Sequence, residues 1–174
     1  MANLSEDSGF IPPDEYVDII RQTQIVSADL IIFNQRGEIL LGKRNNSPAK
    51  NTWFVPGGRV RKYETITDAV KRISLQEVGT ELETTSLLGV YNHIYTDNFK
   101  NSDTGTHYVC FANNIILDEN KEGEVIDSLK NVEDNQHSEF RWWSAADILN
   151  HPDDEEVHMY TKNYFHPTSW NKES

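Results

Sequence analysis

One basic segment of the chain carries residue types that could bind a diphosphate together with a metal ion. Residues 43–72 contain eight lysines and arginines against two acidic residues, a local charge of +6. Arginine forks match the geometry of phosphate groups, and carboxylate and carbonyl oxygens are the ligands that Mg²⁺ prefers. This pattern favours binding of a small polyanion. On charge alone, a scatter of solvated lysines and arginines remains the alternative.

The rest of the chain has the opposite charge. The 174 residues carry a net charge of −12 and a pI near 4.8, which argues against broad binding to nucleic acid or to an anionic membrane surface. The apolar runs are far shorter than the ~20 residues that span a bilayer. The lone Cys110 excludes an internal disulfide, and the first residues lack the pattern of a signal peptide. We therefore expect a cytoplasmic protein.

Strand patterns dominate the segments that flank the basic residues. Residues 25–33 and 38–42 are apolar and β-branched around a polar turn, which predicts a β-hairpin. Aromatic and β-branched residues also concentrate in four further segments and predict strands there. These segments are residues 53–55, 86–95, 106–117 and 139–143.

The clearest helix follows the basic segment. Residues 65–78 combine an apolar stripe with Thr65 as the expected N-cap and Gly79 as the expected stop. Weaker helices are predicted at 144–149 and 155–164. The acidic stretches at 118–139 and 153–156 are interpreted as solvated loops. Together the elements predict a mixed sheet with helices packed on it, an α+β fold or a sandwich of those layers.

The glycine-rich loop and the helix after it resemble a known motif. The segment from Gly57 to Gly79 is similar to the Nudix box, a loop–helix–loop that holds a metal–diphosphate substrate. The positions that match it are Gly58, Glu64, Arg72, Glu77 and Gly79, whereas Ile73, Ser74, Gln76 and Thr80 depart from it. The resemblance implies a Nudix-type α/β/α sandwich with a mixed β-sheet.

The departures remove two carboxylates from one helical face. Positions 73, 76 and 77 are three and four residues apart and share that face. The ordinary family carries three metal-binding glutamates there, and this chain carries Ile, Gln and Glu. One carboxylate cannot neutralise a cluster of divalent ions. The pattern therefore implies a single Mg²⁺ or Mn²⁺ and disfavours metal-activated attack on phosphorus.

A Nudix branch with the same losses is the GDP-mannose mannosyl hydrolases. The similarity includes residues 25–30, 41–44, 53–60, 98–99, 106–109, 136–137 and 141–142. It implies hydrolysis of GDP-mannose, or GDP-glucose, to GDP and free sugar by C–O cleavage with inversion, in a homodimer. Residues 21–166 would form the Nudix domain. Residues 1–20 would form an N-terminal segment that could cross to the partner subunit, and residues 167–174 a C-terminal tail.

The resemblance also implies how the metal and the diphosphate are held. The Gly57 carbonyl, the Glu77 carboxylate and the Gln136 side chain would be the oxygen ligands of the ion. Arg44 and Arg59 would bind the diphosphate and favour its departure.

Five further positions match the sugar and base contacts of the branch. His137 would be the general base that activates water. Asp29 and His93 would lie near the leaving group and the sugar, and Phe10 and Tyr108 would stack on guanine. For each of these side chains, an ordinary structural role is the alternative.

Two other functions fit the same residues less well. A Nudix pyrophosphatase that cleaves P–O bonds in a nucleotide-sugar or a nucleoside triphosphate would share Gly58, Glu64 and Glu77, but Ile73 and Gln76 remove carboxylates which that chemistry uses. A Nudix domain without activity, which only binds a nucleotide-sugar, would not need His137. The sequence does not distinguish mannose from glucose.

Overall fold

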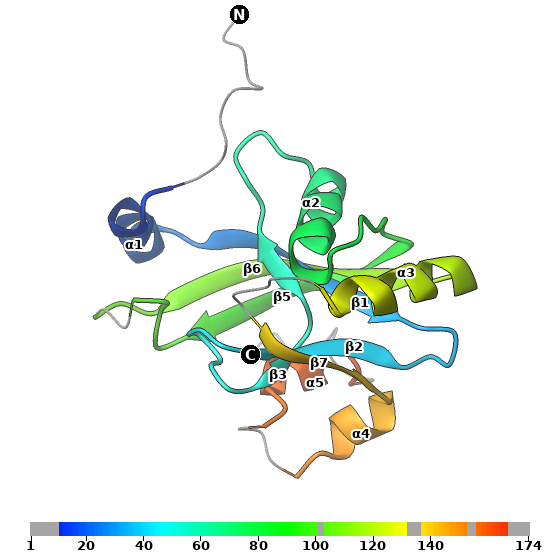
Figure 1. The fold of residues 1–174 in the computed structure, drawn as a ribbon. Coiled ribbons are helices and arrows are strands. Elements are labelled where there is room, and N and C mark those ends of the chain that lie inside the picture. Colours follow the sequence, from blue (N-terminus) through cyan, green and yellow to red (C-terminus); the bar gives the residue numbers. More distant parts are fainter. Residues whose placement is uncertain (1–10, 101–102, 132–136, 153–155, 167–174) are drawn as a thin grey trace, which may run out of the picture.

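The structure is a computed structural model that describes residues 11–100, 103–131, 137–152 and 156–166. Its elements (Figure 1) are α1 (Pro13–Gln22), β1 (Ile25–Phe33), β2 (Ile39–Arg44), β3 (Trp53–Phe54), β4 (Gly57–Arg59), α2 (Ile66–Val78), β5 (Ser86–Tyr95), β6 (Thr106–Ile116), α3 (Glu119–Leu129), β7 (His137–Trp143), α4 (Ala145–Asn150) and α5 (Met159–Asn163).

The strands form one mixed sheet with β1 near its centre. Within the described residues the strand order is β3-β2-β1-β6-β5, β4 pairs with β1, and β7 pairs with β2. The β1–β6 pair is parallel, whereas β1 runs antiparallel to β2 and β4. The strands predicted at residues 25–33, 38–42, 53–55, 86–95, 106–117 and 139–143 are present with shifts of a few residues at their ends.

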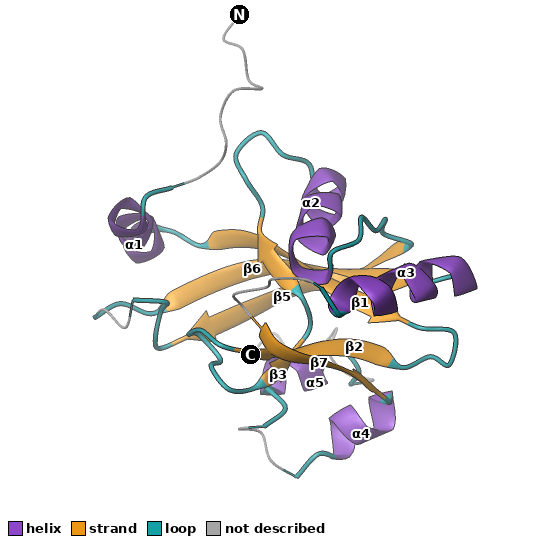
Figure 2. Cartoon of the chain, viewed as in Figure 1, coloured by secondary structure: helices purple, strands orange, loops and turns teal. Residues whose placement is uncertain are grey.

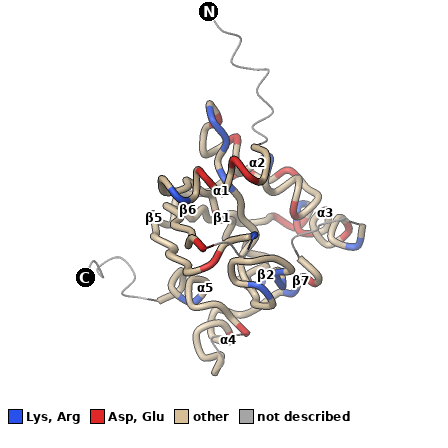
Figure 3. The backbone as a smooth tube through the Cα atoms, turned by 90° about the vertical axis from the view of Figure 1, so that its left-hand side faces the viewer, with Lys and Arg blue, Asp and Glu red and all other residues tan. Residues whose placement is uncertain are grey.

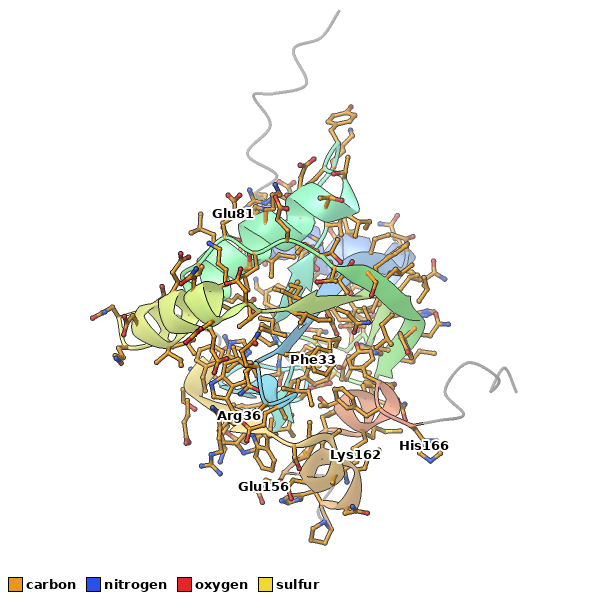
Figure 4. The ribbon with its side chains drawn as sticks, turned by 90° about the vertical axis from the view of Figure 1, so that its right-hand side faces the viewer. Phe33, Arg36, Glu81, Glu156, Lys162 and His166 are labelled. Carbon is orange, nitrogen blue, oxygen red and sulfur yellow. The ribbon has the colours of Figure 1, made fainter. Side chains whose placement is uncertain are left out.

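Helices cover both faces of this sheet (Figure 2), so the predicted α+β sandwich is confirmed. Neighbouring residues of β1 point to opposite faces. Leu30 and Ile32 pack with residues of α2 and α3 in one core cluster. Ile31 packs in a second cluster with Ile148 of α4 and Tyr164. Figure 4 gives the same picture from the side, with Glu81 in the upper layer and Glu156 and Lys162 in the lower one.

The helix after the basic segment begins and ends as the sequence predicts. The Thr65 side chain accepts a hydrogen bond from the Asp68 N–H at 3.1 Å, which satisfies one of the exposed amides of the first turn. Gly79 adopts the left-handed conformation with φ of 77°, which ends the helix.

Two helices correct the sequence-based interpretation. Residues 119–129 of the acidic stretch form α3 rather than a solvated loop, because Asp118 caps the helix and Val125 is fully buried against the sheet. Helix α1 was not predicted: it begins at Pro13 within the expected N-terminal segment and buries Val17 and Ile20. Among the described residues, no helix is long and apolar enough to span a membrane.

Candidate functional site

A cavity of about 300 Å³ opens where β1, β4, β5 and β6 meet α1 and the end of β2. Six of the residues selected from the sequence line it: Asp29, Arg44, Gly57, Arg59, His93 and Tyr108. Strand pairing explains this convergence, because Asp29 lies opposite Gly57 in the β1–β4 ladder and His93 lies opposite Tyr108 in the β5–β6 ladder. Residues from five separate strands therefore face one space.

The glycine-rich loop brings oxygen donors together at the edge of the cavity. The Gly57 N–H donates to the buried Glu77 carboxylate at 2.9 Å. A side chain at Gly57 would overlap the Asp29 carboxylate, so glycine allows this close approach. Glu77, Asp29 and the Gly57 backbone thus offer carboxylate and carbonyl oxygens in one place. This donor set fits Mg²⁺ or Mn²⁺.

A charged pair fixes the loop to α2. Arg72 Nε donates to Glu64 at 2.6 Å and Arg72 Nη2 donates to the other Glu64 oxygen at 2.8 Å, a bidentate geometry. Arg72 Nη2 also donates to the Arg59 carbonyl at 2.9 Å. Burial raises the pKa of Glu64, but hydrogen bonds from Arg72 and from the Arg61 N–H outweigh it, so this pKa lies below its usual value. Arg72 therefore orients the loop through its hydrogen bonds to the Glu64 carboxylate.

The other positions on the same face of α2 do not offer carboxylates. Ile73 is buried in the core and packs beneath Gly58. Gln76 accepts a hydrogen bond from Arg72 Nη1 at 3.0 Å. Of positions 73, 76 and 77, only Glu77 carries a carboxylate toward the loop.

The two arginines assigned to the diphosphate line the cavity wall and stack on aromatic rings. Arg44 Nε donates to the Pro48 carbonyl at 3.0 Å, and its guanidinium lies 5.9 Å from the centre of the Phe54 ring. The Arg59 guanidinium lies 5.5 Å from the centre of the Tyr16 ring. These contacts keep both cations at the cavity surface. Basic residues also lie on the loop before α2 and at the end of β2 (Figure 3).

Asp29 is the buried carboxylate of the cavity floor. Its Oδ2 accepts a hydrogen bond from the Tyr164 hydroxyl at 2.5 Å. Burial raises the pKa of Asp29 to about 6, although the Tyr164 hydrogen bond, Cys110 and the charge of Arg44 each lower it. A carboxyl with this pKa can change its protonation state close to neutral pH.

His93 lies beside Asp29 and is enclosed by tyrosines. Burial, together with the charge of His158, lowers the pKa of His93 to about 3, so its imidazole is neutral. Asp29, His93 and Cys110 bring ligand atoms within 4.8 Å of one another and could hold a metal ion. Cys110 and Tyr164 were not predicted to belong to the site, because neither lies in a recognisable motif.

Aromatic rings from distant segments complete the cavity. The rings of Tyr95 and Tyr108 lie 6.2 Å apart and edge-on, and those of Tyr16 and Phe99 lie 5.6 Å apart. All four line the cavity. Burial raises the pKa of Tyr108, so its hydroxyl stays protonated. Tyr16 was missed because α1 was not predicted, although Pro13 at its start, two acidic residues in its first turn and the spacing of Val17 and Ile20 are signals for a helix.

Of the other four selected residues, Glu77 reaches the edge of the cavity through its hydrogen bond with the Gly57 N–H and does not itself line the cavity. His137 begins β7 opposite Arg44 and is buried, with its ring against Gly42 and 5.1 Å from the Phe140 ring. Among the described residues, His137 does not line the cavity. Phe10 and Gln136 lie outside the described residues.

The structure thus combines a mixed sheet covered by helices on both faces with a glycine-rich loop and a glutamate-bearing helix at the edge of one cavity. The family model described as the NUDIX domain matches residues 23–163. The chain therefore belongs to the Nudix family and is a Nudix hydrolase. Enzymes of this family generally use divalent metals such as Mg²⁺.

Similar sequences and a solved structure support the assignment of the chain to the Nudix family. The chain is 36% identical over 155 residues to the low-salt glycan biosynthesis protein Agl8 of Haloferax volcanii, and the match covers 88% of each chain. It is 43% identical over 61 residues to an ADP-ribose pyrophosphatase of Methanocaldococcus jannaschii, covering 35% of this chain and 36% of that protein. A MutT NUDIX hydrolase from Burkholderia pseudomallei has the same fold, with a TM-score of 0.65 and 26% identity over 83% of this chain and 97% of that one.

Proposed function

We propose that this Nudix hydrolase cleaves a GDP-sugar, GDP-mannose or GDP-glucose, to GDP and the free sugar by attack of water at the anomeric carbon. The single observation that carries the proposal is the face of α2, where Ile73 enters the core and Gln76 is held by Arg72. That face leaves Glu77 as its one carboxylate. Attack on phosphorus by a metal-activated water usually draws on several such ligands.

The arrangement of charge in the cavity suits departure of a diphosphate. Arg44 and Arg59 line the same cavity as Asp29 and His93. Guanidinium groups beside the diphosphate would stabilise the negative charge that develops as the bond to the sugar breaks. A bound Mg²⁺, held by Glu77, the Gly57 carbonyl and Gln136, would add positive charge at the same leaving group.

The remaining assigned residues have roles in binding and in proton transfer. Tyr108, together with Phe10, would stack on the guanine ring. His93 and Asp29 would contact the sugar and the leaving oxygen. Displacement on the face opposite GDP gives inversion of the anomeric centre.

His137 is the proposed general base for the attacking water. Its backbone pairs with Arg44 in the β2–β7 ladder, so it lies beside the arginine assigned to the diphosphate. To reach a water molecule in the cavity, its ring must turn away from Gly42 and Phe140. We expect His137→Gln to lower kcat while leaving binding of GDP nearly unchanged.

A relative's role in glycan metabolism supports a sugar-containing substrate. The relative that matches over 88% of its length is named for glycan biosynthesis. The ADP-ribose pyrophosphatase match spans only 61 residues, but it favours a second candidate, P–O cleavage of a nucleotide-sugar or a nucleoside triphosphate. The two candidates differ in which bond breaks.

Hydrolysis of GDP-mannose with Mg²⁺ in ¹⁸O-labelled water separates them. We expect GDP without label, and mannose that carries ¹⁸O at its anomeric carbon, read by ³¹P NMR and mass spectrometry. Fresh product should be the anomer opposite to that of the substrate, read by ¹H NMR before it equilibrates. GMP and mannose 1-phosphate, with ¹⁸O on one phosphate, would establish the pyrophosphatase instead. GDP-glucose in parallel determines the sugar preference.

A further inference from the structure

The buried tyrosine that follows α5 touches the cavity floor from outside the cavity. Tyr164 is 4% exposed and does not line the cavity. Its ring packs edge-on against Tyr91, with ring centres 4.9 Å apart and planes at 88°. Its backbone N–H donates to the Thr161 carbonyl, and Thr161 is itself buried. The position of this side chain is therefore fixed by the C-terminal segment.

The hydroxyl of Tyr164 contacts three side chains, one from each of β1, β5 and β6. It donates to Asp29 Oδ2 at 2.5 Å and lies 3.1 Å from His93 Nε2. Cys110 Sγ lies 3.6 Å away. The phenol oxygen thus occupies the space between the three atoms that could otherwise share a metal ion.

The hydrogen bonds of the Tyr164 hydroxyl determine which ring nitrogen of His93 carries the proton. A tyrosine hydroxyl has one proton and two acceptor lone pairs. Because that proton is donated to Asp29, the contact with His93 is a hydrogen bond only if the Nε2–H of the imidazole donates to the tyrosine oxygen. The geometry therefore selects the neutral tautomer that is protonated at Nε2 and leaves Nδ1 as an acceptor.

The same segment also holds the flat face of His93. The ring of Tyr160 stacks on it with centres 4.3 Å apart and planes at 11°. The Tyr160 hydroxyl donates to the Ile94 carbonyl at 2.8 Å and accepts from the Ile94 N–H at 2.8 Å, which ties α5 to β5. His93 is thus held on its face by one tyrosine and at its edge by another.

We propose that Tyr164 is a positioning residue: its hydroxyl orients the Asp29 carboxylate and fixes the Nε2–H tautomer of His93 at the cavity floor. The effect on catalysis rests on the proposed function, because it acts through two residues assigned to the sugar and the leaving group. The effect on the tautomer does not depend on the substrate.

The structural part is tested by ¹⁵N NMR of the histidine ring nitrogens in the full chain, with His93 assigned by comparison with His93→Gln. In the wild type we expect a protonated Nε2 and an unprotonated Nδ1 at neutral pH. In Tyr164→Phe, which keeps the ring and removes the hydroxyl, the two signals should shift toward a mixture of tautomers. Unchanged ¹⁵N shifts in Tyr164→Phe would overturn the proposal.

Tyr91→Phe is the matched control, since Tyr91 also has a buried hydroxyl and packs on Tyr164. We expect it to lower the melting temperature comparably and to keep the wild-type ¹⁵N pattern. Loss of the pattern in Tyr91→Phe as well would show that general loosening, rather than the Tyr164 hydroxyl, moves His93, and would also overturn the proposal.

Kinetics on GDP-mannose tests the consequence for the reaction. We expect Tyr164→Phe to lower kcat by about tenfold or more with KM changed by less than about threefold, since misplaced groups act mainly on the reacting geometry. Equal kcat in Tyr164→Phe and Tyr91→Phe would refute the positioning role. If the wild type does not hydrolyse GDP-mannose, the proposed function fails while the ¹⁵N experiment still tests Tyr164.

A cobalt titration tests the alternative that Asp29, His93 and Cys110 bind a metal ion. With Tyr164 in place we expect no cobalt–thiolate absorption band from Cys110. A band that Cys110→Ser removes would mean that the cluster coordinates a metal, and the hydrogen-bonded arrangement would be wrong.

Discussion

Replacing the buried carboxylate of Asp29 with asparagine should stabilise the protein at alkaline pH. Burial raises the pKa of Asp29 to about 6, from an ordinary value of 3.8. A folded-state pKa above the unfolded value means that the associated stability is fully present below pH 3.8 and is lost as the pH rises through 6. A shift of about two pKa units corresponds to about 3 kcal/mol of folding free energy. Asparagine avoids this loss because it does not ionise.

The measurement is urea unfolding of the wild type and of Asp29→Asn, with EDTA present, at several pH values between about 4 and 8. We expect the stability of the variant relative to the wild type to increase by about 2.5 kcal/mol across this range, because part of the loss has already occurred at pH 4. The relative melting temperature should increase by about 5 to 10 °C. Any packing cost of asparagine that does not depend on pH cancels in this comparison.

Asp14→Asn is the control, because the Asp14 side chain is 95% exposed and its charge is lost without a change in burial. If the stability curves of Asp29→Asn and the wild type run parallel from pH 4 to 8, the carboxylate of Asp29 is not desolvated and the reasoning is wrong. Asp29→Asn should also have much lower activity on GDP-mannose, because the Asp29 carboxylate, which destabilises the fold, is placed at the leaving group.

Two other predictions concern the loop and its helix. Arg72→Met should lower the unfolding free energy by about 2 to 3 kcal/mol in urea at pH 7, because it leaves Glu64 partly buried without its bidentate partner; the pKa of Glu64 is lowered from 4.5, so this difference should shrink below that pH, and a difference below about 0.5 kcal/mol would place the pair among weak surface pairs. Glu77→Gln should raise the Mg²⁺ concentration needed for half-maximal activity by about tenfold or more, whereas Gln76→Ala on the same turn should change it little; equal effects of both variants would contradict the assignment of Glu77 to the metal.

Much of the site could be predicted because its chemistry is local in sequence. The loop from Gly57 and the helix to Gly79 form one continuous segment, and helical spacing alone places positions 73, 76 and 77 on one face. Thr65 and Gly79 specify the ends of that helix through their own backbone and side-chain preferences. The long strands were predictable for the same reason, because their apolar and β-branched residues are contiguous.

Other features depend on contacts between distant residues. Helix α3 exists because Val125 is buried against the sheet, although its neighbours are mostly acidic. The register of β1 against β4 and of β5 against β6 decides which side chains share the cavity. No local pattern predicts these pairings.

The cavity floor shows which features follow from local sequence and which depend on contacts between distant residues. The glycine-rich loop, the glutamate on α2 and the loss of two carboxylates beside it follow from residue type and helical spacing. The contact between Tyr164 and Asp29, which lies 135 residues earlier in the chain, depends on the tertiary structure. A buried carboxylate requires a hydrogen-bond donor, and the fold supplies this donor from the residue that follows α5.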